Sequence, residues 1–282
     1  MTKQQRMALF TIGLSVFWIA TECLAETFVL KSGKVVTGKM VGRVADSAGV
    51  PTAIIVESDG QRATYAIEDI ADIKEMHEEE MPSTQPMYGG IVRTPEEQAI
   101  DAEFLKRAVQ EFGSRAKASE AQMQFGWQYF DQGDWRTAMK RFNQAWLLQP
   151  DNADVFWGFG SVALDKRDAD QAIAMFEKSI SLNPLHAPVV CSLGSAHQLK
   201  ATQMPSRAAA TPHLEESVKY CAQGAALDAK EEFCYTTWAG TLMLQGKYGE
   251  AWDKVRAAQR LGGKTVNPDV LHDLSRLQPE PR

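Results

Sequence analysis

The sequence predicts a multidomain α+β protein: a small five-stranded β-barrel, then an all-α solenoid of about four helical hairpins with a C-terminal capping helix. Three observations support this. Runs rich in Val, Ile and Thr alternate with glycine turns over residues 26–76. A pattern of small and bulky residues then recurs at a fixed period over residues 119–265. Residues 266–282 contain a short apolar helical pattern that would cover the exposed end of a stack.

The composition is that of a globular protein. The chain has 282 residues, of which 44% are hydrophobic, so it can bury one or two cores. The formal net charge is −6, whereas a general affinity for nucleic acid needs a basic surface. We therefore expect no nucleic-acid partner.

The first residues have the features of a secretory signal. Lys3 and Arg6 precede an apolar run of signal-peptide length, and Cys23 and Ala25 place small residues before a cut after Ala25. The sequence therefore predicts a signal peptide over residues 1–25 and an exported protein in the periplasm of a bacterium. The alternative is an uncleaved segment that anchors the chain to the inner membrane, which would be its one membrane link.

The five short strands expected within residues 26–76 are separated by turns at Ser32-Gly33, residues 46–49 and Asp59-Gly60. Closing them into a barrel would remove exposed strand edges. The pattern VLKSGKVVTGKMVG…AIIVESDGQRATYAIEDIADIKE resembles the SH3-like or Sm-like small barrels of bacterial envelope proteins. This resemblance implies an adaptor rather than an RNA-binding module, since the chain is acidic and carries an export signal.

Residues 77–94 have the composition of a solvated linker, with an acidic run, three prolines and Gly89-Gly90. Thr94 and Pro95 then predict the N-cap and first turn of a helix. An amphipathic helix is expected within residues 95–116 and ends near Gly113.

The period in the second half of the chain is 34 residues. The matching sets are Ala138, Phe142, Ala145; Ala172, Phe176, Ile180; Ser217, Cys221, Gly224; and Ala251, Val255, Ala258. This period and the large-small pairs Phe125-Gly126 and Phe159-Gly160 resemble the tetratricopeptide repeat (TPR) family. The expected repeats are 119–152, 153–186, 187–231 and 232–265. The third is longer than the others, and we expect residues 201–212 to form a long loop inside it.

The TPR resemblance implies a concave groove lined by first-helix residues. The positions carried over as partner-binding are Met123, Trp127, Phe130, Trp157, Ser161, Leu164, Ser195, Thr236 and Met243, with Asp154, Gln198 and Phe233 at further positions of this kind. The Lys and Asn residues that clamp a peptide carboxylate in this family are absent here. An apolar, aromatic groove suits an amphipathic helix or an apolar extended segment. Two alternatives remain open: the 95–111 helix fills the groove, or these residues are core.

The sequence contains no recognisable catalytic motif and no spacing of metal ligands, so we expect no enzyme activity, no cofactor and no metal. Three cysteines remain after cleavage. Cys221 and Cys234 lie on consecutive antiparallel helices and form the predicted disulfide, while Cys191 falls at a groove position. Three buried, reduced thiols are the alternative.

These observations predict an exported, non-enzymatic scaffold that binds a protein or peptide partner through an apolar or amphipathic segment. The alternative function is a self-associating envelope structural or assembly factor, which would form a homo-oligomer. An enzyme of unrecognised type is a remote third, because catalytic triads need not be local in sequence.

Overall fold

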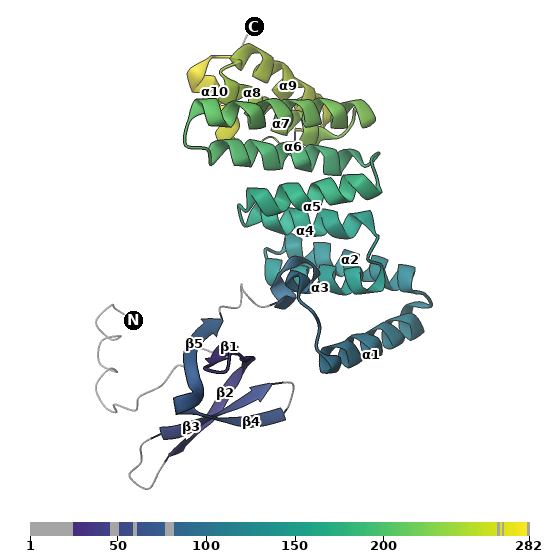
Figure 1. The fold of residues 1–282 in the computed structure, drawn as a ribbon. Helices are drawn as coiled ribbons and strands as arrows, with labels where there is room; N and C mark the ends of the chain where they lie inside the picture. The colour runs from purple at the N-terminus through teal and green to yellow at the C-terminus, as the bar shows by residue number, and fades with distance from the viewer. Residues whose placement is uncertain are drawn as a thin grey trace, which may run out of the picture. The chain divides into compact units, whose positions relative to one another are not determined.

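The computed structural model describes residues 25–45, 51–58, 61–76, 82–263, 266 and 268–280. The chain divides into two compact units, Met1–Met81 and Pro82–Arg282 (Figure 1). The predicted signal peptide therefore lies outside the described residues except for Ala25, which begins the first strand. Among the described residues, no helix combines the length and apolar character that crossing a bilayer requires.

The first unit contains an antiparallel sheet. Its strands are β1 (Ala25–Leu30), β2 (Val35–Ala45), β3 (Pro51–Ser58), β4 (Gln61–Ala66) and β5 (Ile70–Met76), with the 3₁₀ turn η2 (Ile67–Asp69) before β5. Their order in the sheet is β4-β3-β2-β1-β5. Phe28, Ile54 and Val56 form its buried core. Gly38 permits close contact of β2 with β3, because a Cβ there would come within 2.6 Å of Val56 Cγ1.

The five strands follow the predicted segments, but the predicted closed barrel is not seen. Strands β4 and β5 are the two edges of the sheet, and no pairing joins them in the described part of the chain. The physical reason is visible in β4, where the side chains from Gln61 to Thr64 are all exposed. A strand with so little apolar surface gains little by closing against the opposite edge.

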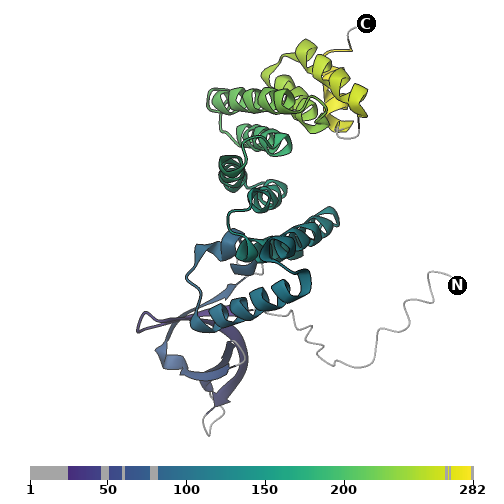
Figure 2. The ribbon, with the colours of Figure 1, turned by 90° about the vertical axis from the view of Figure 1, so that its right-hand side faces the viewer.

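The second unit is a solenoid of helices. Its helices are α1 (Pro95–Phe112), α2 (Arg115–Asp131), α3 (Trp135–Leu148), α4 (Ala153–Asp165), α5 (Ala169–Leu182), α6 (Ala187–Thr202), α7 (Arg207–Leu227), α8 (Glu232–Gln245), α9 (Tyr248–Leu261) and α10 (Pro268–Leu277). Helices α2 to α9 pair in chain order into hairpins that stack on one another (Figures 1 and 2). The predicted helical solenoid is confirmed.

Local signals position the helix starts in the same register. Asp134 and Asp168 stand 34 residues apart and cap the second helices of two successive hairpins. Each carboxylate accepts a hydrogen bond of 3.0 Å, from the backbone N–H of Thr137 and of Gln171. Because the same cap recurs at the repeat period, each second helix begins at an equivalent point.

Glycine and phenylalanine together set the close packing of the hairpins. The Phe142 ring is fully buried and fills the space beside Gly126 and Gly158, so a Cβ on either glycine would overlap it. One repeat later, a Cβ on Gly160 would come within 2.5 Å of the Phe176 ring. The large-small pairs predicted from the period therefore have a direct packing role.

The long loop predicted at residues 201–212 is wrong. Helix α6 continues to Thr202 and α7 already begins at Arg207, so the extra residues lengthen the two helices of the hairpin. The Ser206 hydroxyl accepts a 3.2 Å hydrogen bond from Ala209 N and caps α7. This cap and the run of alanines favour the helix more than Pro212 disfavours it near the helix start.

Part of the predicted linker is packed rather than solvated. Residues Pro82–Thr84 and Pro86–Gly90 form two 3₁₀ turns, η4 and η5, against α3. The buried Asn143 amide donates hydrogen bonds of 3.0 and 2.8 Å to the carbonyls of Ser83 and Gln85. The turns stay attached because this side chain supplies the partners that their backbone needs. Residues 77–81 of the linker lie outside the described residues.

The structure also corrects the disulfide. Cys234 of α8 pairs with Cys191 of α6, with 5.0 Å between their Cα atoms, and Cys221 is a buried free thiol. The pair meets beside Gly224 of α7, where a Cβ would overlap Cys191 Sγ and approach Cys234 Sγ to 2.8 Å. Burial raises the pKa of the Cys221 thiol to about 12. That thiol therefore stays protonated and unreactive.

A histidine pair lies inside the lengthened hairpin. The Nδ1 atoms of His197 and His213 are 3.2 Å apart, and Tyr220 stacks on the His197 ring. Burial, and to a smaller extent the neighbouring His213, hold the pKa of His197 below its ordinary value of 6.5. As the pH falls below 6.5, the unfolded chain therefore binds a proton before the folded protein does.

We expect the stability of the helical unit to be fully present above pH 6.5 and to fall as the pH is lowered further, because His197 titrates late in the folded state. Thermal melting between neutral and mildly acidic pH measures this. His197→Phe keeps an aromatic ring against Tyr220 and should flatten the decline. His272→Phe, at an exposed residue of α10, is the control. Equal pH dependence in wild type and His197→Phe would contradict the assignment.

Candidate functional site

Five of the predicted partner-binding residues line one hollow. Trp127 and Phe130 come from α2, and Trp157, Ser161 and Leu164 come from α4. The hollow has a volume of about 510 Å³, and its other lining residues, from α4, α6, α8 and the turn before α8, are Asp165, Pro188, Ser192, Glu231 and Phe233. We call this hollow the aromatic groove.

Helical spacing explains why these side chains meet. Trp157, Ser161 and Leu164 are four and three residues apart, so they share one face of α4. The ring centroids of Trp127 and Trp157 are 4.6 Å apart, so the first helices of two successive hairpins contribute adjoining indoles. Trp127 also meets Phe130 edge to face, with centroids 5.7 Å apart. Packing against other rings therefore holds the aromatic wall in place.

A second hollow of about 360 Å³ adjoins the aromatic groove and shares Leu164 with it. The predicted residues Ser195 and Met243 line this adjoining hollow, together with Arg167, Gln198, Leu199, Thr202, Gly240, Leu244 and Val270. The Gln198 amide donates a 3.1 Å hydrogen bond to Thr241 Oγ1, which orients it. The two hollows together cross α2, α4, α6 and α8.

Two predicted residues do not line either hollow. Met123 is 5% exposed and belongs to the core between α2, α3 and α4, so a partner cannot reach it. Thr236 is half-buried, and its hydroxyl donates a 3.0 Å hydrogen bond to the carbonyl of Phe233. Family positions alone do not show how far each helix is rotated toward the groove, which is why these two assignments are wrong.

The sequence reasoning missed the polar and helix-terminal part of the lining. Asp165 ends α4, Pro188 is the second residue of α6, and Glu231 is the N-cap of α8. Helix ends fall outside the repeat positions from which the groove was predicted. The sequence signal that could have found Glu231 is its place as an acid directly before an apolar helix.

The alternative in which the 95–111 helix fills the groove does not agree with the structure. Helix α1 packs at the N-terminal end of the stack, where Ala108 meets Ala118 and Leu148. None of the residues that line the aromatic groove comes from α1. In the described part of the chain the groove is therefore open to a ligand.

The aromatic groove carries acidic groups without a matching base. Asp165 and Glu231 line it, and none of the described residues that line it is Lys or Arg. The Glu231 carboxylate accepts a 3.3 Å hydrogen bond from Phe233 N, which keeps it at the groove. Beside the groove, the His186 ring meets Trp157 edge-on and its Nδ1 lies 3.6 Å from Asp154 Oδ1.

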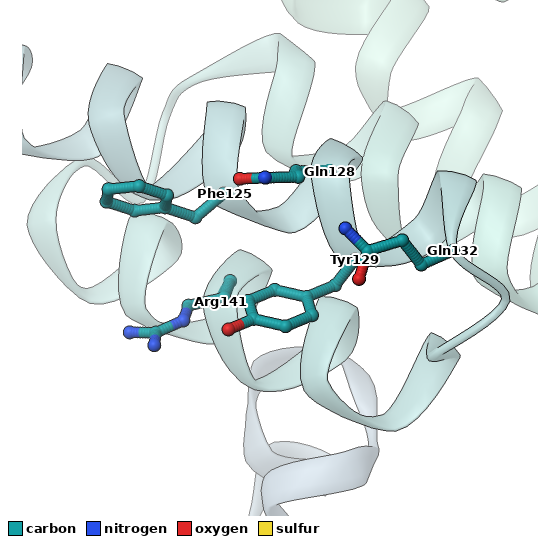
Figure 3. Close-up of a pocket in the computed structure, with 5 residues that line it drawn as sticks. All are labelled: Phe125, Gln128, Tyr129, Gln132 and Arg141. Carbon is teal, nitrogen blue, oxygen red and sulfur yellow. The ribbon is translucent and has the colours of Figure 1, made fainter.

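A separate hollow of about 350 Å³ lies on another face of α2, lined by Phe125, Gln128, Tyr129, Gln132 and Arg141 (Figure 3). The Arg141 guanidinium carbon lies 5.8 Å from the centre of the Phe125 ring and 5.9 Å from that of Tyr129. Arg141 also donates a 3.1 Å hydrogen bond to Gln144 Oε1. Its charge is thus already engaged, and we regard the aromatic groove as the better candidate site.

Within the described ranges, no group of three or more His, Cys, Asp or Glu side chains is arranged to hold a metal ion. The one free thiol in those ranges is buried.

Comparison with known proteins identifies the fold. No protein family matches the sequence, and no curated protein does so. The TPR protein TTC0263 of Thermus thermophilus is similar in structure, with a TM-score of 0.51 and 15% identity over 56% of this chain and 80% of that chain. Residues 41 to the end of MamA from Desulfovibrio magneticus RS-1 give 0.42 and 16% over 60% of this chain and 97% of that one.

YrrB, described as a TPR protein with an unusual peptide-binding site, also gives a TM-score of 0.42, at 16% identity over 62% of this chain and 92% of that chain. Identities this low show the fold alone, and the TM-score of TTC0263 is the one that supports a shared arrangement of helices. The helical unit of this protein therefore has a TPR-like fold, as its period predicts.

Proposed function

We propose that this chain is an exported, non-enzymatic scaffold whose aromatic groove binds an apolar or amphipathic segment of a protein partner. The observation that carries the proposal is the pair of half-buried indoles, Trp127 and Trp157, 4.6 Å apart in the wall of an open hollow. Aromatic anchors of this kind contribute most of the binding energy at many interfaces. The TPR-like fold supports the proposal, because stacked hairpins present an extended concave surface.

Export is part of the proposal. The predicted signal peptide supports it, and so does the Cys191–Cys234 disulfide, since such bonds persist in oxidising compartments. We propose the bacterial periplasm as the location, and an adaptor role for the N-terminal sheet, whose sequence resembles SH3-like or Sm-like barrels.

The groove is tested with a synthetic amphipathic peptide of Leu and Gln, titrated into the purified protein by calorimetry. Trp157→Ala should weaken its binding by more than tenfold, as for other buried aromatic anchors. Trp135→Ala is the matched control, because Trp135 is also half-buried but lines neither the groove nor the adjoining hollow.

Two results would contradict the proposal. One is unchanged peptide binding by Trp157→Ala. The other is a stable oligomer in light scattering with Trp157 inaccessible to a fluorescence quencher, which would favour the self-associating assembly factor instead.

A further inference from the structure

We propose that the partner segment carries a Lys or Arg side chain, which sits against the indoles of the aromatic groove and is neutralised by Asp165 and Glu231. This inference rests on the proposed function, because it specifies the chemistry of the segment that the groove binds.

The two carboxylates are the first support. Asp165 comes from α4 and Glu231 from the start of α8, so two separate hairpins each contribute an acid to one hollow. Neither forms an ion pair within the described part of the chain, although Glu231 also caps α8. Two negative charges beside a mainly apolar surface favour an opposite charge on the ligand.

The indoles are the second support. Elsewhere in the molecule tryptophans carry their own cations: Lys254 Nζ lies 3.5 Å from the centre of the Trp238 ring, and Lys166 Nζ lies 4.3 Å from that of Trp135. In the described structure Trp127 and Trp157 pack against aromatic rings instead, and no Lys or Arg lines their hollow. A ligand cation can therefore gain a cation–π interaction there.

The adjoining hollow indicates where the cation sits. Arg167 lines that second hollow, and it would repel a ligand cation placed beside it. The basic side chain is therefore expected at the Trp127 and Trp157 end, with an apolar part of the ligand reaching past Leu164 toward Met243.

The size of the surface favours a peptide segment over a small free cation. The aromatic groove and the adjoining hollow share Leu164, and together they extend across four first helices. A segment several residues long can fill both, whereas a small ammonium ion would contact the aromatic end alone. We therefore assign the cation to a basic, apolar segment of a partner protein.

The test uses three amphipathic peptides with the same Leu positions and with Lys, Gln or Glu at the polar positions. Calorimetry at physiological ionic strength should show the Lys peptide binding at least tenfold tighter than the Gln peptide, and the Glu peptide binding most weakly. The double variant Asp165→Asn with Glu231→Gln should remove this preference and still bind the Gln peptide. Gln at position 231 retains an oxygen that can cap α8.

The matched control is Glu177→Gln with Glu250→Gln. Both residues are exposed on second helices and line none of the hollows described above, so this variant changes the net charge equally and should keep the preference. Equal binding of the Lys and Gln peptides, both lost in Trp157→Ala, would overturn the inference and leave the proposed function intact. A preference that survives the Asp165 and Glu231 substitutions also overturns it. Binding that does not depend on Trp157 would instead refute the proposed function.

Discussion

Replacing Phe142 with alanine should lower the free energy of unfolding of the helical unit by about 3–5 kcal/mol. The ring is fully buried, fills the space between Gly126 and Gly158, and contacts Trp127 with centroids 5.3 Å apart. Its removal leaves a cavity at the junction of two hairpins, which the close-packed helices cannot easily fill. Urea denaturation followed by circular dichroism measures the change.

The control for this substitution is Phe125→Ala. Phe125 belongs to the same pair of helices but is 42% exposed, so its loss should cost about 1 kcal/mol or less. A loss of stability as large as that of Phe142→Ala would show that the core is misassigned. Because Phe142 supports Trp127, the Phe142 variant should also weaken the peptide binding described above.

Reduction of the Cys191–Cys234 disulfide should lower the stability of the folded protein by about 4 kcal/mol, the chain-entropy value for a bridge that closes a loop of this length. The two cysteines are 43 residues apart in sequence and join α6 to α8. Each is next to a residue of the aromatic groove, Ser192 or Phe233. Reduction is therefore also expected to loosen the groove wall.

Thermal melting with and without a reductant measures this effect, and the double variant Cys191→Ser with Cys234→Ser should melt at the low temperature under both conditions. Cys221→Ser is the control: it retains the bridge, so its melting temperature should still fall on reduction. A reductant-dependent shift that disappears in Cys221→Ser would instead support the pairing predicted from sequence.

The helical unit illustrates how much of a repeat fold is readable from sequence. Hydrophobic spacing at 3.6 residues per turn, Asp134 and Asp168 as caps, and glycine opposite phenylalanine all recur at 34 residues. These signals act within one helix or between neighbours in the chain. They predicted the hairpins, and through the family resemblance they predicted five of the ten residues that line the aromatic groove.

Features that depend on balances between competing local effects were less readable. Residues 201–212 contain a proline and small polar residues, which favoured a loop, yet Ser206 and the alanines after it extend α7 through Pro212. Residues 82–90 have linker composition, yet Asn143, far away in sequence, satisfies their backbone. In both cases contributions of a few kcal/mol or less decide the outcome, and composition does not reveal which is larger.

The sequence alone therefore determined the period, the helical hairpins and the aromatic character of the groove, because these follow from local spacing. The tertiary structure decided which cysteines pair, that the N-terminal sheet is open at its edges, and that Asp165 and Glu231 meet at one hollow. Such pairings depend on the rotation and separation of elements distant in the chain. Packing of the whole unit sets both, and no single segment encodes them.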